Sequence, residues 1–278
     1  MNLISEKLID KISSVLDIIY DPFGLKKGQR DFTNALFNKI ANCEDLNINI
    51  EERMAVINEY KLLLLKNKNR KNIVEKACEN LKDNASPSSI DNSWLLNFWD
   101  KSGTITDVNL QEIWGKVLAQ QANMPNSISK RLLHNLFLMS KNDADNFSIL
   151  ASFCFDDNKY NIAHPLVFIK NHPVAYKNWG LTTDILNELA SFSLIETNYE
   201  TGFAFESQRE FFYKNYSITV KKEHFKEHFS VGNVRLTEDG QKLYQIIDKY
   251  KQEKILEYTI ERLQYRNCYV DITTENLF

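Results

Sequence analysis

The sequence has few of the residues that break helices or cross-link loops. Glycine occurs 8 times and proline 5 times in 278 residues, so we expect long helices with few tight turns. The four cysteines (Cys43, Cys78, Cys154 and Cys268) are far apart and form no CxxC pair. We therefore interpret them as reduced, mostly buried thiols, which indicates a cytoplasmic protein.

Long apolar runs and an excess of one charge are also missing. No run reaches the ~18 residues of a membrane span, so no membrane segment is expected. The start, MNLISEKLIDKISSVLDIIY, carries an acid or a lysine every few positions, unlike a secretory signal. A net charge of -3 argues against a protein that coats nucleic acid through bulk charge.

Helical periodicity dominates the first 155 residues. An N-terminal helical region, residues 1–83, contains predicted helices over 2–20, 28–42 and 48–81. In the longest of them, Leu62 to Leu65 is apolar on all sides, which indicates contacts from several directions. The segment NASPSS, residues 84–89, is a linker by composition.

A central helical module is predicted over residues 90–155. Asp91 or Asn92, Thr106 or Asp107, Ser127, and Ser140 are candidate N-caps of its helices. Its three tryptophans, Trp94, Trp99 and Trp114, are expected in the core rather than around a ligand.

Residues 156–278 change character and favour an α+β domain. Asp156-Asp157-Asn158 is predicted to be a turn, and the two His-Pro pairs that follow favour extended structure or loops. A helix near 183–192, alternating segments over 201–235 and a helix that opens with LTEDGQKL resemble the order of a winged-helix domain with an enlarged wing. The predicted fold class is therefore mainly α, with a C-terminal winged-helix-like α+β domain.

Several segments together resemble a known family. They are NKNRKNIVEKACENL, IDNSWLLNFWDKSGTITDVNLQEIWGKVLAQQANMPNSISKRLLHNLFLMSKNDADNF and VRLTEDGQKLYQII, which span roughly residues 65–250. They are similar to the bacterial family called domain of unknown function 2806. The matching residues are Asn72, Ile73, Trp94, Leu95, Trp114, Leu118, Ala119, Pro125, Ser127, Leu236, Thr237 and Gly240. The resemblance implies a soluble bacterial protein and supplies no catalytic residues. The chain also resembles, more distantly, helical proteins linked to abortive infection by phage.

Catalytic motifs are scarce. No P-loop or dinucleotide fingerprint occurs, and Cys154, near His164, lies in an apolar run where a thiol is expected to be buried. The segment HFKEH has the H-x-x-E-H spacing of inverted zinc proteases, so His224 and His228 are candidate metal ligands with Glu227 as general base. Chance matches of this motif are common in charged segments, so no cofactor is predicted.

A stretch over residues 209–226 interleaves basic and aromatic side chains. Arg209, Lys214, Lys221, Lys222 and Lys226 are the candidate contacts to phosphates, and the neighbouring aromatics are candidate stacking platforms for bases. The simpler interpretation is a strand pair that is aromatic on its inner face and charged on its outer face.

Three functional hypotheses follow. The favoured one is a non-enzymatic cytosolic binding or regulatory protein that acts through a homo-oligomer or a protein partner, with bacterial anti-phage defence as its expected setting. The helix at 48–81 is its expected contact surface. The alternatives are a nucleic-acid-binding module that uses residues 209–226 and a zinc hydrolase at the H-x-x-E-H motif.

Overall fold

The computed structural model describes residues 2–16, 49–222 and 228–274. The chain forms two compact units, Met1–Leu133 and His134–Phe278, each with its own buried core. This division falls inside the predicted module 90–155, so the predicted domain boundaries stay a prediction.

The first unit is helical. Its described elements are α1 (Leu3–Leu16), α3 (Ile50–Glu79), the 3-10 helix η1 (Pro87–Ser89), α4 (Asn92–Ser102), α5 (Val108–Asn123) and α6 (Lys130–Leu138), the last of which runs into the second unit. The helix predicted at 28–42 lies outside the described residues. Asp91 and Asp107 cap α4 and α5 as predicted. The cap predicted at Ser127 is wrong, because the side chain of Ser129 accepts the hydrogen bond from the first turn of α6.

The core of this unit forms where α3 crosses α4 and α5. Trp94, Trp99 and Trp114 are buried, as predicted. Gly115 makes the approach of α5 to α3 possible, because a Cβ at this position would lie 2.4 Å from the Cβ of Lys76. A larger residue here would therefore force the two helices apart.

Two buried amides connect α3 with α5. The side chain of Gln111 donates to Asn69 Oδ1 at 3.2 Å and to the Ile105 carbonyl at 2.8 Å. It also accepts a hydrogen bond from Asn72 at 3.1 Å. Asn69 in turn donates to the Gly103 carbonyl at 2.9 Å. These neutral groups satisfy one another, so their burial costs little.

The second unit combines helices with strands. Its helices are α7 (Lys141–Ser152), η2 (Ile169–Asn171), α8 (Pro173–Lys177), α9 (Thr183–Ser191), α10 (Glu238–Ile246) and α11 (Glu253–Tyr265). Its strands are β1 (Cys154–Asp157), β2 (Ile162–Pro165), β3 (Ile195–Thr197), β4 (Phe203–Phe205), β5 (Arg209–Tyr213), β6 (Tyr216–Lys222), β7 (Phe229–Gly232), β8 (Val234–Leu236) and β9 (Cys268–Thr274). Ser140 caps α7 as predicted, and Thr182 and Thr237 cap α9 and α10.

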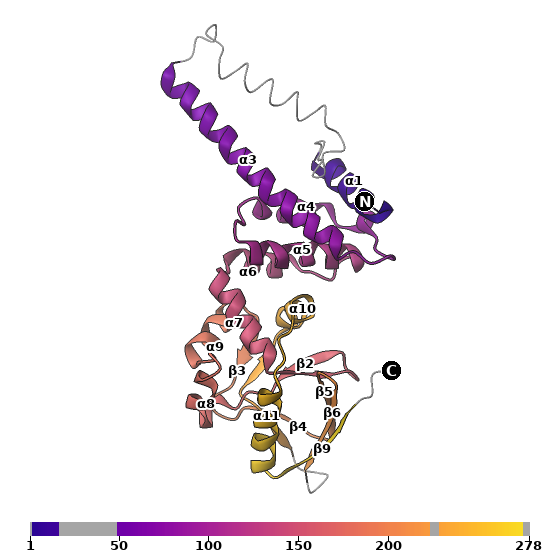
Figure 1. Ribbon diagram of the computed structural model, residues 1–278, viewed down its shortest axis with the longest axis vertical. Coiled ribbons are helices and arrows are strands. Elements are labelled where there is room, and N and C mark those ends of the chain that lie inside the picture. The colour runs from indigo at the N-terminus through magenta and orange to yellow at the C-terminus, as the bar shows by residue number, and fades with distance from the viewer. Residues whose placement is uncertain (1, 17–48, 223–227, 275–278) are drawn as a thin grey trace. The chain divides into compact units, whose positions relative to one another are not determined.

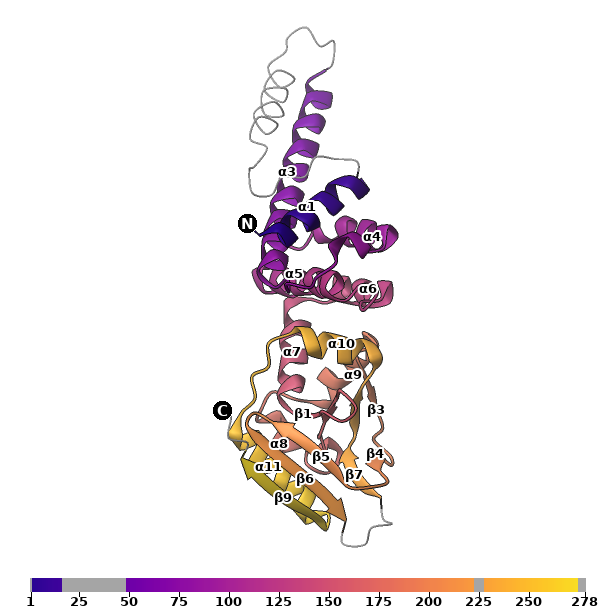
Figure 2. The same ribbon diagram turned by 90° about the vertical axis from the view of Figure 1, so that its right-hand side faces the viewer.

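A five-stranded antiparallel sheet organises this unit, in the order β2-β1-β5-β6-β9 (Figure 1). Figure 2 shows β5, β6 and β9 side by side. Two further pairs, β3 with β8 and β4 with β7, complete the strands of the described chain. Of the described residues, 57% are helical and 17% are in strands.

The predicted fold class, mainly α with a winged-helix-like domain, is therefore wrong. Residues 209–222 are not part of an enlarged wing, because β5 and β6 lie in the middle of the sheet. Two causes explain the error. The predicted turn at Asp156-Asp157 is the end of β1, which pairs with β2 at an edge that tolerates Pro165. Strand β9 pairs with β6 over its whole length across a long sequence separation, which local patterns do not reveal.

The LTEDG segment has a steric role at the start of α10. Thr237 donates from its backbone to the Leu194 carbonyl at 3.0 Å and caps the helix through its hydroxyl. A Cβ at Gly240 would lie 1.9 Å from that same carbonyl oxygen. Glycine at this position therefore lets α10 pack directly on the loop before β3.

Candidate functional site

The predicted phosphate-binding lysines have partners within the protein. Lys214, in the turn between β5 and β6, pairs with Glu253 at 3.4 Å, and Lys221 on β6 pairs with Asp271 at 3.6 Å. Lys222 donates at 2.8 Å to a main-chain carbonyl at the end of α11. The exposed ion pairs contribute little stability, so the lysines remain accessible to other anions, but their position is explained without a ligand.

Arg209 and its aromatic neighbours lie on the inner face of the sheet. The Arg209 guanidinium lies 4.4 Å from the ring centre of Tyr160 and 4.7 Å from that of Phe205. Phe211 and Tyr213 are fully buried. These two rings therefore pack in the core and are closed to nucleotide bases, as the simpler interpretation of this stretch expects. Nucleic-acid binding by residues 209–226 stays a prediction.

The H-x-x-E-H motif falls largely outside the described residues, which exclude His224, Lys226 and Glu227. His228 is exposed, directly before β7. Over 2–16, 49–222 and 228–274, no group of three or more His, Cys, Asp or Glu side chains is arranged to hold a metal ion. The zinc hypothesis thus stays a prediction about this motif alone.

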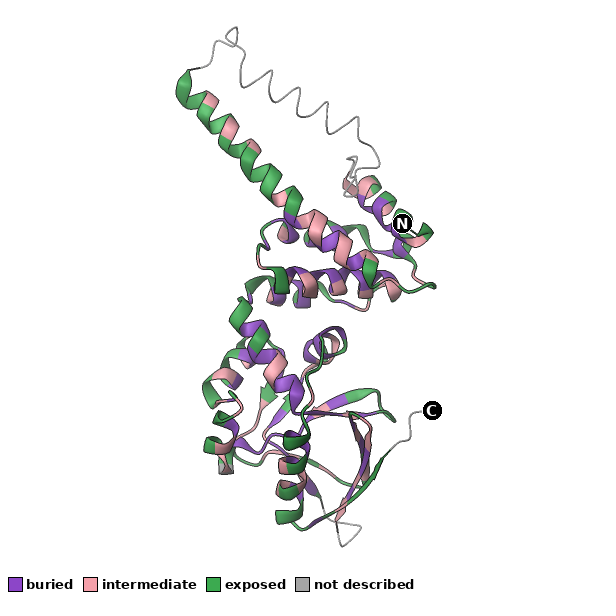
Figure 3. Ribbon diagram, viewed as in Figure 1, coloured by how far each residue is buried: buried purple, intermediate pink, exposed green. Residues whose placement is uncertain are grey.

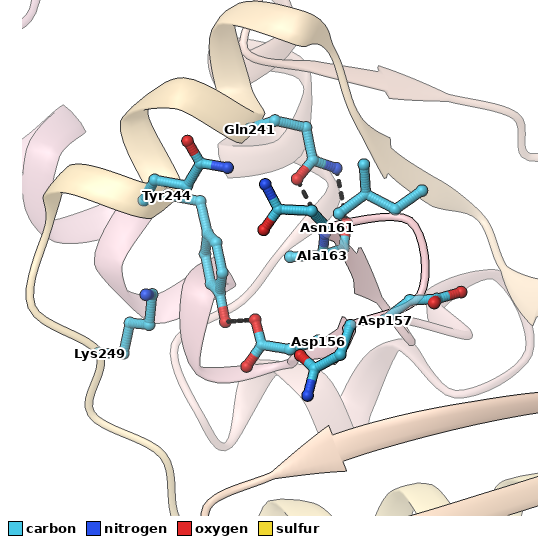
Figure 4. Close-up of a pocket in the computed structure, with 10 residues that line it drawn as sticks. Asp156, Asp157, Asn161, Ala163, Gln241, Tyr244 and Lys249 are labelled. Carbon is cyan, nitrogen blue, oxygen red and sulfur yellow. Dashed lines mark hydrogen bonds between the residues drawn. The ribbon is translucent and has the colours of Figure 1, made fainter. Parts of the chain in front are cut away.

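A small polar pocket of about 130 Å³ opens beside β1 and α10 (Figure 4). On one wall, the side-chain amide of Gln241 accepts from the Ala163 backbone N–H at 2.8 Å and donates to its carbonyl at 2.7 Å. The pocket is lined by Asp156, Asp157, Asn158, Asn161, Ile162, Ala163, Gln241, Tyr244, Gln245 and Lys249. Its size and lining suit a few water molecules or a small polar ligand.

Asp156 lies on the wall opposite Gln241, and both of its carboxylate oxygens are engaged. The Tyr244 hydroxyl donates to one at 2.8 Å, and Lys251 forms a short ion pair with the other. Burial raises the pKa of Tyr244, with the Cys154 thiol and the Asp156 carboxylate as further causes. These contacts tie β1 to the segment around α10, so this carboxylate is a structural link rather than an available base.

On the other side of β1, Asp157 and His164 form a second polar pair. The two side chains approach to 4.0 Å, between Asp157 Oδ2 and His164 Nε2, and neither of these buried atoms has a hydrogen-bond partner in the part of the chain that the structure describes. Burial lowers the pKa of His164 to about 4, with Asp157 opposing the shift and Arg209 adding to it. The Nε atom of Arg209 is likewise buried without a partner. His164 is therefore neutral at pH 7.

Cys154 does not act with His164. It is fully buried, burial raises the pKa of its thiol, and its sulfur contacts the Leu150 carbonyl. A thiol in this environment is unreactive. The sequence had indicated this burial. It did not indicate the Asp157–His164 pair, because a turn followed by extended structure or loops was expected where β1 and β2 form a hairpin.

The side chains of α3 differ strongly in solvent exposure along the length of the helix. Its C-terminal part buries Asn69, Ile73, Val74 and Ala77. Its N-terminal part contributes no buried side chain, and Leu62 to Leu65 are each between 44% and 49% exposed. Figure 3 shows the change from exposed to buried along the helix. The leucine segment, Leu62–Leu65, is an apolar surface whose position was predicted.

By its fold the chain is an α+β protein, with a helical unit and a unit built on an antiparallel sheet. The model of the family described as "Protein of unknown function (DUF2806)" matches residues 59–260, and the chain belongs to this family. A search of curated proteins and a search of solved structures find no match. Within the described ranges, every helix is too short or too polar to cross a membrane.

Proposed function

We propose that the protein is a non-enzymatic binding or regulatory protein that acts through self-association of α3. The observation that carries the proposal is the leucine segment: four consecutive leucines, each about half exposed, on a helix that otherwise buries its C-terminal part. Contiguous exposed apolar surface of this kind marks sites of protein interaction.

The charges around the leucine segment favour a second copy in antiparallel orientation. The N-terminal side of α3 carries Glu51, Glu52 and Glu59 against Arg53 and Lys61 and is weakly acidic, whereas the segment KNKNRK at residues 66–71 is basic. Antiparallel pairing centred on the leucines brings each acidic end to the basic segment of its partner, whereas parallel pairing brings like charges together. Glu59, Leu63 and Lys66 share one helix face, since they follow one another at spacings of four and three residues.

The first test compares matched leucine substitutions. The double variant Leu63→Gln/Leu64→Gln removes apolar surface that carries little of the folding energy, because both side chains are half exposed. Leu96→Gln on α4 is the control, since Leu96 is 48% exposed. We expect light scattering with size-exclusion chromatography to give a mass above 32.5 kDa for the wild type and Leu96→Gln, and 32.5 kDa for the double variant. A monomeric wild type at high concentration contradicts the proposal.

The second test examines orientation. Lys66→Glu is expected to weaken association, and adding Glu59→Lys is expected to restore it, because the antiparallel pair then has the same charges exchanged. Failure of the second substitution to restore the mass excludes the antiparallel arrangement.

The setting of this activity is part of the proposal. The family resemblance and the distant likeness to abortive-infection proteins support a role in the bacterial cytosol, in defence against phage. Plaque counts on cells that express the wild type or Leu63→Gln/Leu64→Gln test it. We expect protection to be lost with self-association, and equal plaque counts with and without the wild-type protein contradict the defence role.

A further inference from the structure

Two arginines and a histidine meet where the end of α11 packs against the segment around η2 and α8. Arg262 Nη1 lies 3.4 Å from His172 Nε2. One turn later, the Arg266 guanidinium lies 4.1 Å from the ring centre of Phe168 and donates at 3.1 Å to the Arg262 carbonyl. We call these three side chains, His172, Arg262 and Arg266, the arginine cluster.

The positive charge of the arginine cluster is poorly balanced. In the described part of the chain, the single ion pair to it joins Arg262 to Glu261 at 3.6 Å, and the Glu261 side chain is 66% exposed. Lys222 adds a further positive charge, because its amine donates to the Arg266 carbonyl. Burial lowers the pKa of His172 and of Arg266, and the neighbouring guanidinium groups lower both further.

Two hydrogen-bond donors, one in the arginine cluster and one on a neighbouring tyrosine, lack an acceptor among the described residues. Arg262 Nε and the Tyr258 hydroxyl are buried, and neither has a hydrogen-bond partner among the described residues. The Arg262 guanidinium lies 5.1 Å from the centre of the Tyr258 ring, so both groups belong to the same place in the fold. Buried donors without partners are costly, which indicates that an acceptor is missing here.

The dipole of α11 explains only part of why positive side chains gather at its C-terminal end. Cations near the C-terminus of α11 are stabilised by the helix dipole, and Arg266 also satisfies the carbonyl of Arg262. The dipole leaves Arg262 Nε and the Tyr258 hydroxyl unsatisfied, and His172 lies outside α11.

We propose that the arginine cluster binds a phosphate group, with the guanidinium groups of Arg262 and Arg266 as its principal ligands. Guanidinium groups match the geometry of phosphate oxygens and bind them through paired, charge-assisted hydrogen bonds. The Tyr258 hydroxyl supplies a further donor, and a bound phosphate favours the protonated ring of His172, which can then donate as well. The phosphate belongs either to a small molecule, such as a nucleotide, or to a nucleic-acid backbone. This site does not involve Lys214 or Lys221, and it does not depend on self-association of α3.

The test uses the full chain and three probes: inorganic phosphate, AMP and a short single-stranded oligonucleotide. In the wild-type protein, saturating probe is expected to raise the pKa of His172, because a bound anion favours the imidazolium; NMR titration of the His172 ring measures this. This readout needs no variant and therefore does not depend on how a substitution folds.

Variants then locate the ligand groups. Arg262→Gln and Arg266→Gln are each expected to weaken binding about tenfold or more by calorimetry, since each loses charge-assisted hydrogen bonds. Arg235→Gln is the matched control, because Arg235 belongs to the same unit and forms an exposed pair with Glu196. It should bind like the wild type.

The three probes distinguish a small phosphate ligand from a nucleic-acid backbone. Tighter binding of the oligonucleotide than of AMP, lost in Arg262→Gln, assigns the site to a nucleic-acid backbone, and the reverse order assigns it to a small phosphate ligand. The proposal is overturned if no probe at millimolar concentration raises the pKa of His172, or if Arg262→Gln and Arg266→Gln bind all three probes as the wild type does.

Discussion

The interiors of the two units differ in the buried polar atoms that lack a hydrogen-bond partner among the described residues: the helical unit has neutral indole nitrogens, whereas the sheet unit has atoms of ionisable side chains. Between α3 and α5, the amides of Asn69 and Gln111 are neutral and satisfy each other and nearby carbonyls. Inside the sheet unit, atoms of Asp157, His164 and Arg209 are buried and have no hydrogen-bond partner within the described residues 134–222 and 228–274. The amide network satisfies its own hydrogen bonds, whereas the ionisable groups of the sheet unit are buried at a cost in stability.

The two kinds of buried polar group should have different effects on stability. A satisfied amide network fixes how two helices pack, so its loss should be felt as instability at every pH. Unsatisfied ionisable groups lower stability, so removing them should be harmless to the fold and should change its response to pH. Three predictions follow this contrast, beginning with the largest effect.

Gln111→Ala should cost about 4 kcal/mol of unfolding free energy, because it leaves Asn69, Asn72 and the Ile105 carbonyl without their shared partner. Urea unfolding of the full chain at pH 7, followed by fluorescence of the tryptophans beside α5, measures the change. Gln120→Ala, on the same helix and partly exposed, is the control and should change stability by less than about 1 kcal/mol. A similar loss in both variants contradicts the network.

His164 should make the sheet unit sensitive to acid. Above pH 6.5, His164 is neutral in the folded and unfolded chain and contributes no pH dependence. Between pH 6.5 and about 4, the unfolded chain binds a proton that the folded chain does not, so stability falls by up to about 3 kcal/mol. His164→Phe should lack this part of the loss. Urea midpoints of both proteins at pH 7 and pH 4.5 measure the difference, and equal losses count against it.

Asp157→Asn should have the smallest effect, a gain of about 1 kcal/mol at pH 7. The substitution keeps an oxygen for the backbone N–H of Tyr160, which donates at 3.3 Å, and removes a carboxylate that is 2% exposed. Thermal unfolding at pH 7 is the measurement. A marked loss of stability would show that the Asp157 carboxylate is compensated in the native state.

Local signals predicted the helices of this protein well. The caps at Asp91, Asp107 and Ser140 and the burial of the three tryptophans depend on residues close in sequence, and the structure confirms them. The exposed leucine segment also lies on the predicted helix.

Pairing between strands that are distant in sequence could not be predicted from local patterns. The sheet joins β9 to β6 and β1 to β5, and neither pairing leaves a local pattern. For the same reason, the sequence did not single out Arg262 with His172, which come from segments far apart along the chain. Asp157 and His164 are close in sequence, and they were missed because the hairpin of β1 and β2 was not predicted.

Gln241 has a consequence for how the sheet meets other chains. Its amide imitates a peptide group, occupying both the N–H and the carbonyl of Ala163 on the outer strand β2. An intruding strand therefore finds no template for pairing at this position, which protects the molecule from edge-to-edge aggregation and from β-augmentation there. Any strand addition to the five-stranded sheet is directed to the opposite margin, along β9.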